Sequence, residues 1–440
     1  MSFIHKDSCE CLKTELDLFT APLTQTAIES GIWSEYNPIT SIGEANPIEF
    51  NVQGAGSDYI DLAATQIQVR AQIVLANGNP IDNTHHVGPI NLFLHSLFAD
   101  VEVKLNDIQV SSSNNLYPYR AMLETLLSYG SACKQSQLQC SLYYKDQAER
   151  HDMHDPTDAN GNAGLRKRYA HVRAGRIVDL LGTLHTDLIF QEKYLPSDVG
   201  MRIRLIRSKN AFCLMTNDQN PAYRVKILEC KLLIRKAKIS PSVYLAHARA
   251  FEVGNAKYNI RRALCKSYTI AAGAHDDTHE ALFTGQVPAR LVICMVDNDA
   301  YNGTYVKSPF NFQNYDIRSI KILVDGQSNQ IVKTIETNFG ERQSIAAYAS
   351  LFLGTGKFRR DEDIDIERDE YPHGFTIFAY DLSPDNSEQS HFNLIQHGSV
   401  RVELKFGTPT PHTINVLCFA ELEQVIEIDR SRNILMDYAH

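Results

Sequence analysis

The sequence lacks the features that mark a zinc-ribbon, membrane or secreted protein. It contains 9 cysteines among 440 residues, and no two of them stand in a C-x-x-C pair, which excludes a zinc ribbon. No apolar stretch approaches the roughly 20 residues that a membrane span needs, and the first residues show no basic region followed by an apolar one. We therefore expect a soluble protein, made inside a cell, without a membrane span.

An excess of positive charge is also missing. The chain has 43 Lys and Arg against 52 Asp and Glu, a net charge of −9, so wholesale coating of nucleic acid is not expected. With 43% hydrophobic and 22% charged residues, the composition is globular and excludes disorder. At roughly 150 residues per domain, the length predicts two or three domains. Most cysteines stand in apolar runs, such as Ile293-Cys294-Met295, and are interpreted as free thiols that pack like small hydrophobic side chains.

Alternation of apolar and polar residues is the dominant pattern from about residue 48 onward. It predicts antiparallel strands with one solvated face, and clear examples are 101–105, 201–205 and 400–406. Helical patterns are too few for an α/β fold and cover 117–129, 242–251 and 341–353. The first 45 residues are interpreted as an arm with one short helix from Asp7, whose spacing to Glu10 fits a capping box.

The chain also repeats its own pattern once, in four elements that recur in the same order. The matched segments are a strand, a helix, a second strand and a long strand: 101–107 with 320–326, 119–130 with 345–356, 201–205 with 400–404, and 225–239 with 414–428. A single match of this kind arises by chance. A shared order with a drifting offset is what loop insertions between equivalent elements produce.

These observations predict an all-β protein made of two tandem eight-stranded antiparallel jelly-roll sandwiches, with short helices in the connecting loops. The predicted parts are an N-terminal arm at 1–45, a first jelly roll at 46–240 and a second at 241–440, which opens with a linking helix. The longest insertion lies in the first copy, near 131–175.

Three segments carry a more specific likeness: Ser8-Cys9-Glu10-Cys11-Leu12-Lys13-Thr14-Glu15-Leu16-Asp17-Leu18-Phe19, Pro22-Leu23-Thr24-Gln25-Thr26 and Glu427-Ile428-Asp429-Arg430. With them, the chain resembles the major capsid proteins of Polinton (Maverick) elements and adintoviruses over nearly its whole length. These are virus-like mobile elements integrated in animal genomes. The likeness is one of overall sequence rather than of a short signature.

This resemblance implies a structural protein of the virion capsid, made in the host cytoplasm or nucleus, that is not an enzyme and has no cofactor. It implies a hexon-like homotrimer whose six sandwiches form a pseudo-hexagonal tower. Towers and a pentameric vertex (penton) protein would build an icosahedral shell around double-stranded DNA. A trimer of a duplicated domain presents six similar flanks, so one chain fills sixfold positions. The arm would tie neighbours together on the inner face, and the 131–175 loop would form outer surface and inter-subunit clasps.

The segment 150–161 is the richest in candidate metal ligands. On a helix, His151 would share a face with His154 or Asp155, a geometry that metal ligands use. Pro156 and the following Asn-Gly pair instead predict a loop, and an EF-hand fails because Pro156 falls at its first ligand position. We interpret the segment as a solvated loop and assign no metal, catalytic or cofactor-binding residues.

Other charged segments are interpreted as surface. Surface turns or loops are predicted at His85-His86, 275–280 and 361–370. The alternatives are acid/base work by Asp276 or Asp277 with His279, and a catalytic pair of acids within 361–370. Surface salt bridges are predicted at Arg166-Lys167-Arg168 and Arg261-Arg262, with nuclear import or nonspecific contact to packaged DNA as the alternatives. The basic stretch 357–360 beside the acidic 361–370 offers a self-complementary contact between subunits, so reversing the charges of Arg359 and Arg360 should weaken trimers.

Two other functions stay open. Tandem sandwiches also occur in carbohydrate-binding or carbohydrate-active proteins, which would be compact monomers with a carboxylate pair or an aromatic platform in one cleft. A host protein co-opted from a mobile element would keep the fold and form trimers that never close into particles.

Overall fold

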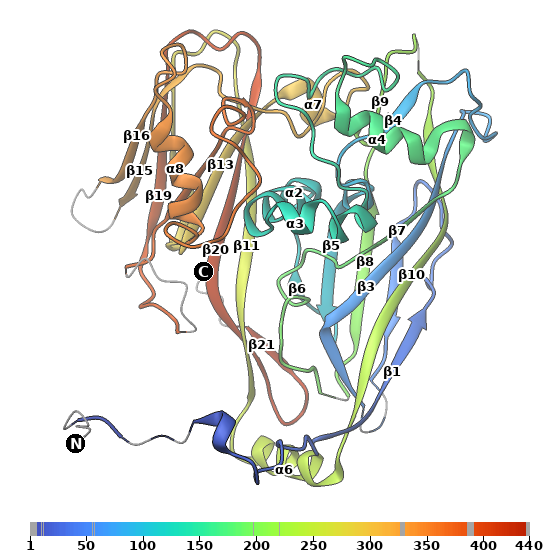
Figure 1. The fold of residues 1–440 in the computed structure, drawn as a ribbon, viewed down its shortest axis with the longest axis vertical. Coiled ribbons are helices and arrows are strands. Elements are labelled where there is room, and N and C mark those ends of the chain that lie inside the picture. The colour runs from blue at the N-terminus through green and yellow to red at the C-terminus, as the bar shows by residue number, and fades with distance from the viewer. Residues whose placement is uncertain are drawn as a thin grey trace.

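Two upright β-sandwiches stand side by side and are joined at the base by helix α6 (Pro241–Val253), as Figure 1 shows. The first sandwich lies on the right of that view and the second on the left. The structure is a computed structural model, and it describes residues 7–436 except 10, 12, 55, 57, 197, 220, 326–330 and 385–390.

The first sandwich pairs its strands in the jelly-roll order. One sheet runs β1-β10-β3-β7 and the other β2-β8-β5-β6, all antiparallel. Numbered one to eight along the chain, the strands follow the orders 1-8-3-6 and 2-7-4-5, so each sheet takes strands from both halves of the roll. The bounds are β1 Ile28–Tyr36, β2 Ile48–Val52, β3 Asp58–Val74, β5 Phe98–Leu105, β6 Ile108–Ser111, β7 Val178–Gly182, β8 Met201–Arg207 and β10 Arg224–Ile239.

The second sandwich repeats this order strand for strand. Its sheets run β11-β20-β13-β18 and β12-β19-β15-β16, which are again 1-8-3-6 and 2-7-4-5, and β21 (Ile434–Met436) adds to the first by pairing with β20. The bounds are β11 Ala256–Ile270, β12 Asp276–Gln286, β13 Arg290–Asp297, β15 Ile317–Asp325, β16 Ile331–Glu336, β18 Ile377–Asp381, β19 His397–Phe406 and β20 Ile414–Ile428.

All four sequence matches join equivalent elements. The fourth strands β5 and β15, the seventh strands β8 and β19, and the eighth strands β10 and β20 are the matched pairs. The matched helices α2 (Tyr117–Ser128) and α8 (Ile345–Gly354) both follow the fifth strand of their roll. The predicted fold of two tandem eight-stranded rolls is confirmed for the part of the chain that the structure describes; the end of the first match, residue 326, lies outside it.

Strand β1 corrects the predicted arm. The prediction placed all of residues 1–45 in the arm, but β1 pairs with β10 from Ile28 opposite Ile239 to Tyr36 opposite Leu232. It was missed because an edge strand with most residues exposed carries no alternating apolar face. The predicted helix is also wrong for the described residues, which form only a 3-10 turn at Thr14–Leu16; residues 10 and 12 of that helix are not described. An isolated short helix has no partner to stabilise it.

The three predicted helices are present as α2, α6 and α8, and two further helices, α3 and α4, lie where a loop was predicted. Within 131–175, Asn162 caps α4 (Ala163–Val172) by accepting hydrogen bonds from the backbone N–H groups of Gly164 and Leu165. The remaining elements are short: α1 Phe93–Ser96, α3 Ser131–Lys134, α5 Asn210–Cys213, α7 Asn298–Asn302, the 3-10 turns Gln137–Ser141 and Arg173–Gly175, and the paired strands β4 Val87–Pro89 with β9 Leu214–Thr216 and β14 Phe312–Gln313 with β17 His373–Gly374.

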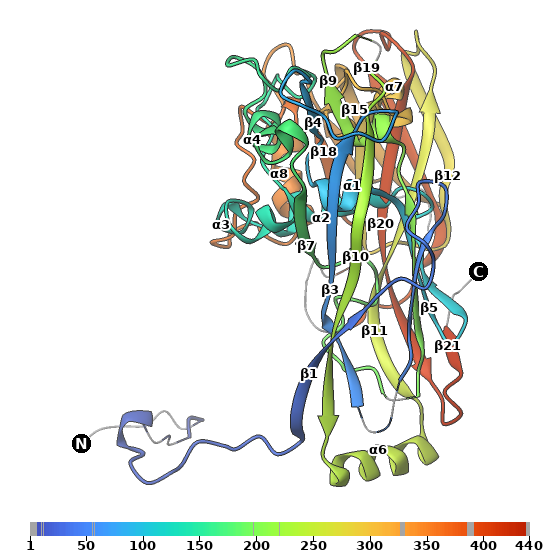
Figure 2. The same cartoon turned by 90° about the vertical axis from the view of Figure 1, so that its right-hand side faces the viewer.

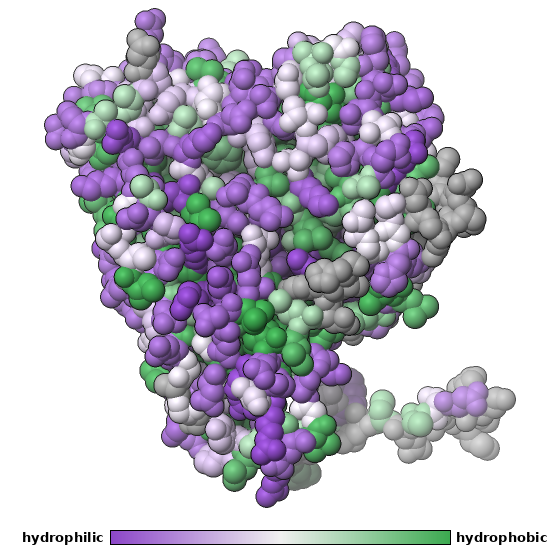
Figure 3. Space-filling view, turned by 180° about the vertical axis from the view of Figure 1, so that it is seen from behind, coloured by the Kyte–Doolittle hydropathy of each residue, from purple (hydrophilic) through white to green (hydrophobic). Residues whose placement is uncertain are grey.

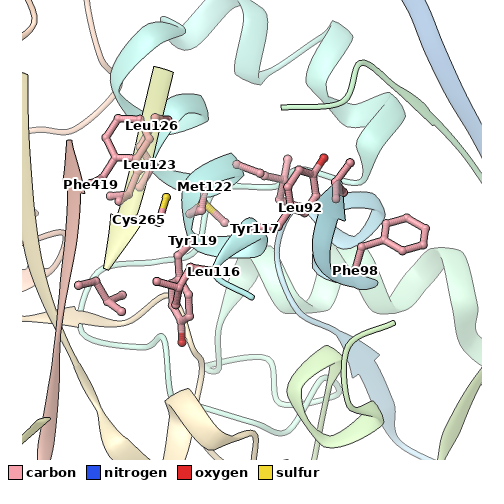
Figure 4. Packing of buried hydrophobic residues seen from close by; sticks show 14 of the residues in the cluster. Leu92, Phe98, Leu116, Tyr117, Tyr119, Met122, Leu123, Leu126, Cys265 and Phe419 are labelled. Carbon is pink, nitrogen blue, oxygen red and sulfur yellow. The ribbon is translucent and has the colours of Figure 1, made fainter. Parts of the chain in front are cut away.

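One continuous apolar core fills both rolls, and α2 lies where they meet. In Figure 4, Leu123 and Leu126 of α2 lie toward Phe419 and Cys265, which belong to β20 and β11 of the second roll. Tyr119 of the same helix stacks on Tyr301 with ring centroids 5.9 Å apart. Burial of this much apolar surface between the rolls makes them one body rather than two linked domains.

Helix α8 lies against β18 so closely that only glycine fits at its end. A Cβ on Gly354 would stand 2.6 Å from the backbone of Ala379. We expect Gly354→Ala to lower the free energy of unfolding by about 1–3 kcal/mol, the usual effect of overpacking. Gly254→Ala is the matched control, because Gly254 is extended and a Cβ there meets nothing within 4 Å. Urea unfolding of both variants tests this, and equal losses would contradict it.

Candidate functional site

The insertion near 131–175 clasps the second roll of the same chain. The Asp152 carboxylate accepts hydrogen bonds from Ser308 N–H at 2.8 Å and from Asn311 Nδ2 at 2.7 Å. The Glu149 N–H donates to the His373 carbonyl at 3.1 Å. These bonds cross from one roll to the other, so the insertion fixes their relative position.

His151 stands inside this clasp, which corrects the solvated-loop interpretation. Its side chain is buried, with the ring centroid 4.8 Å from that of Phe375, and burial lowers the pKa of the imidazole. Gly374 lies against the ring with φ +104°, and a Cβ at that position would overlap the imidazole. The sequence showed a polar loop correctly, but it could not show that the second roll covers it.

The other two candidate ligands of that segment are held by ordinary loop bonds. His154 Nδ1 lies 3.1 Å from the Asp152 carbonyl oxygen. Asp155 accepts a hydrogen bond from its near neighbour Thr157 and another from Asn217. Among the described residues, no three His, Cys, Asp or Glu side chains come together as a metal-binding group.

The charge run at 357–370 forms a second clasp between the rolls. The buried Lys357 donates to the carbonyls of Ser128 at 3.1 Å and Asp363 at 3.2 Å. The Asp363 carboxylate in turn accepts the N–H of Ser131 at 3.1 Å. Ile364, next in the run, is fully buried. The solvated-loop interpretation is therefore wrong for the middle of the run, whose charges satisfy backbone groups within one chain. Contact between subunits through the exposed Arg359 and Arg360 stays a prediction.

Lys134 completes this clasp and gives it a pH dependence. Its buried ammonium donates to the carbonyls of Leu126 at 3.0 Å and Ile364 at 2.6 Å, and burial lowers its pKa to about 7. An unfolded lysine keeps its proton to about pH 10.4. Between these pH values the unfolded state binds more protons, so stability rises with pH, and the cost of burying the charge is fully present below about pH 7.

We expect the stability of the native protein, relative to Lys134→Met, to rise by up to about 1.4 kcal/mol per pH unit between pH 7.5 and 9.5. Urea unfolding at four pH values in that interval measures both slopes. The comparison removes contributions from other titrating groups, because both proteins share them. Parallel slopes for the two proteins would show that Lys134 does not lose its proton on folding.

Arg168 is the largest fully buried side chain, which corrects its assignment to a surface salt bridge. Its guanidinium lies 2.8 Å from Asp146 and donates to the carbonyls of Pro89 at 2.9 Å and Tyr144 at 2.8 Å. A run of three basic residues predicts an exposed segment. Successive residues of a helix point in different directions, however, and on α4 the side chain of Arg168 points toward the packed face. Arg166 is half-buried and donates to the Asp158 and Ala159 carbonyls.

The remaining polar candidates lie in two separate groups. Residues 276–280, predicted as a surface loop, belong to strand β12, where the His279 ring stacks on Tyr268 at 4.6 Å. Burial raises the pKa of the Asp277 carboxyl in the same strand. His85 lies in the predicted turn, with Nδ1 2.7 Å from Asp82. Asp277 and His279 lie together beside Tyr268 in the second roll, whereas His85 and Asp82 lie in the first roll, so the two groups do not share one site.

A network of buried and half-buried charged groups on α2 was not predicted from the sequence. On α2, the buried Arg120 lies 2.9 Å from Glu124 and 2.8 Å from Asp187. Asp187 also accepts the N–H of Ala263 on β11 at 3.0 Å, and His185 Nδ1 lies 2.6 Å from Glu124. Only the i,i+4 spacing of Arg120 and Glu124 was visible as a signal; Asp187 lies 67 positions further along and carries no motif.

Burial and charge oppose each other in this network. Burial disfavours the charge of Glu124, but the Arg120 guanidinium and the His185 ring outweigh it and lower the pKa of the carboxyl. Burial likewise opposes the Arg120 charge, and Asp187 and Glu124 together raise its pKa. A cleft of about 400 Å³ opens beside the network, with Arg261 among its lining residues. The charged groups are already paired with one another, so the arrangement holds the rolls together rather than activating a nucleophile.

Five cysteines are buried in the core, as predicted for thiols in apolar runs. They are Cys213, Cys230, Cys265, Cys294 and Cys418. Burial raises the pKa of the Cys213, Cys230 and Cys265 thiols to about 12. A thiol that stays protonated is a poor nucleophile, so these residues act through packing.

The surface is mixed in character. Polar and apolar side chains are interspersed over the face shown in Figure 3. Strand β1, the edge of its sheet, exposes Ile32 and the chain's one tryptophan, Trp33, each at 55%. Among the described residues, no helix combines the length and the apolarity that a membrane crossing demands.

Comparison with known proteins shows which solved structures share this fold. No family model matches the chain. The uncharacterized protein F54H12.2 of Caenorhabditis elegans is 24% identical over 431 residues, which cover 94% of this chain and 99% of that protein. Among solved structures, the cryo-EM structure of the Sputnik virophage has a TM-score of 0.65 at 12% identity, covering 100% of this chain and 94% of the other.

Two further structures agree with that match. PBCV-1 VP54 has a TM-score of 0.59 at 12% identity, covering 96% of this chain and 100% of VP54. The mavirus major capsid protein has a TM-score of 0.53 at 14% identity, covering 100% of this chain and 97% of the other. This chain has the double jelly-roll fold of viral major capsid proteins. Each of these three comparisons covers at least 94% of both chains, so both rolls belong to the shared architecture.

Proposed function

We propose that this double jelly-roll chain is a structural major capsid protein that catalyses no reaction. Three copies form a pseudo-hexameric capsomer, and capsomers build an icosahedral shell around double-stranded DNA. The observation that carries the proposal is the repetition of one strand order, 1-8-3-6 and 2-7-4-5, in two rolls that share one core. Three rigid pairs of similar rolls supply six similar flanks, which a closed lattice with sixfold positions requires.

Features of the flanks support contact between copies. The rolls are locked by the Arg120 network and by the clasps at Asp152 and Lys357, so each chain presents a tile of fixed shape. The exposed Ile32 and Trp33 lie on an edge strand, where large apolar side chains mark interaction surfaces.

The source we propose is a Polinton (Maverick) element or an adintovirus. The opening and closing segments quoted above support it, as does the likeness over 94% of the chain to a protein of an animal, Caenorhabditis elegans. We further propose a pentameric vertex protein as partner, nonspecific contact with the packaged DNA, and a location in the virion capsid. The viral structures named above do not favour the carbohydrate-binding alternative.

Assembly of the purified full-length chain tests this function. We expect a trimer of about 149 kDa, three times the 49.6 kDa of one chain, in light scattering, and closed particles in negative-stain microscopy when vertex protein is supplied. Trimers that never close would instead indicate a co-opted host protein. Monomers at every concentration would contradict the proposal.

A further inference from the structure

The base of the molecule carries an apolar groove that the fold leaves open. It has a volume of about 680 Å³ and lies between helix α6 and the lower ends of the strands. Its lining includes Tyr59, Val243, His247, Phe251 and Tyr258. None of the residues of α6, all of which are described, is buried, so the helix covers the strand ends only in part.

The N-terminal arm, here residues 13–27, exposes several large apolar side chains. Leu16 is 67% exposed, Leu18 77%, Phe19 96% and Leu23 fully. Four large apolar residues within eight positions are more than a solvated tail needs, and such a cluster marks a binding segment. The segment is short and extended apart from one 3-10 turn, so it presents side chains without a core of its own.

We propose that this groove binds the N-terminal arm of a second copy of the chain, with Phe19 as the residue that enters it. The inference rests on the proposed function, because it requires copies that stand side by side. Arms and grooves lie at the same end of the molecule (Figures 1 and 2). When two copies lie side by side in the same orientation, the arm of one copy is therefore at the same height as the groove of the other.

The root of the arm directs it away from its own body. The Gln25 side chain closes a local turn, accepting from the Ile28 N–H at 2.8 Å and donating to the Ile28 carbonyl at 3.1 Å. The Ser240 N–H holds the Ala27 carbonyl at 2.9 Å. From this anchor the arm runs outward from the base of β1 in Figure 2. Phe19 stands eight positions before Ala27, a reach of up to about 28 Å in extended chain, so it can extend from this anchor to a copy beside it.

Charge agrees with this occupant. The arm carries Glu15 and Asp17 beside its apolar residues, and both are exposed. Two lysines, Lys193 and Lys257, line the groove together with one acid, Glu192. Lys13 pairs with Glu15 in the arm, and Lys257 of the groove pairs with Glu427. Asp17 of the arm and Lys193 of the groove are therefore the opposite charges that this contact brings together.

Photo-crosslinking of assembled full-length protein tests the inference. Phe19 is replaced by p-benzoyl-phenylalanine, and equal amounts of ¹⁴N- and ¹⁵N-labelled chains are mixed before assembly. We expect cross-links from position 19 to groove residues of α6, with mixed isotope labels in about half of the cross-linked pairs. Cross-links with unmixed labels would show that each arm folds back on its own groove, and cross-links elsewhere would show another docking surface; either result overturns the inference.

A matched pair of variants on α6 separates docking from folding. Ala250 lines the groove, whereas Ala246 is exposed on the same helix and does not line it. Ala250→Arg should lower the cross-link yield at least tenfold, while Ala246→Arg leaves it unchanged. Equal yields in the two variants would overturn the inference.

The same experiment distinguishes this inference from the proposed function. If the unmodified chain forms trimers and particles but position 19 does not cross-link to α6 of another copy, only the docking inference fails. If the unmodified chain stays monomeric at every concentration, the capsid function fails, and the docking inference fails with it.

Discussion

Replacing Arg120 by Met is expected to lower the free energy of unfolding by about 3–5 kcal/mol, because it removes the cation that pairs with the buried Asp187 and the half-buried Glu124. Met has nearly the same side-chain volume as Arg, so the substitution removes only the charge and its hydrogen bonds. The loss should nevertheless be large. Urea unfolding at pH 7 followed by circular dichroism measures it.

Arg70→Met is the matched control for this prediction. Arg70 also contacts two carboxylates, Glu229 at 3.1 Å and Asp179 at 3.4 Å, but its side chain is 49% exposed. Exposed pairs contribute little, so we expect a loss within about 1 kcal/mol. A similar effect of the two substitutions would mean that burial of the Arg120 network between the rolls does not stabilise the tile.

The second large effect is expected from Gly374→Ala in the clasp around His151. The added Cβ overlaps the buried imidazole, and the backbone is held at φ +104°. Strain and overpacking together should cost about 2–5 kcal/mol. Gly273→Ala is the control, because Gly273 has φ +83° but its Cβ would meet nothing within 4 Å. Only the strain of about 1–2 kcal/mol should appear there.

A double variant isolates the contact with His151. His151→Ala leaves space for the new methyl group, so the loss caused by Gly374→Ala should be smaller in the His151→Ala background than in the native protein. Residues in contact depart from additivity by about 0.5–3 kcal/mol. Strictly additive losses would show that the imidazole does not limit the space at Gly374.

Periodicity and repetition in the sequence were enough to predict the architecture. Alternating residues in β8 and β19 marked strands with one buried face, and the order of four matches located equivalent elements in both rolls. Strand β1 escaped because most of its residues face water on both sides. A strand of this kind is identified by its partner, β10, and pairing between residues about 200 positions apart leaves no local pattern.

The polar groups between the rolls could not be predicted in the same way. His151 and Arg168 were predicted to be solvated, and Lys357 to belong to a contact between subunits, but all three are buried within the chain. A charged side chain can be buried only when an oppositely charged or hydrogen-bonding group lies within bonding distance. For Arg168 that group is Asp146. The composition of a loop shows that its residues are polar, but it does not show which distant segment will pack over them.

The most direct test of the duplicated-roll account is the outline of the purified oligomer seen along its symmetry axis. Class averages from electron microscopy should show threefold symmetry with six lobes of similar size, one for each roll. An oligomer of three lobes, or a particle without threefold symmetry, would contradict the central claim that two copies of one roll let three chains occupy a sixfold position.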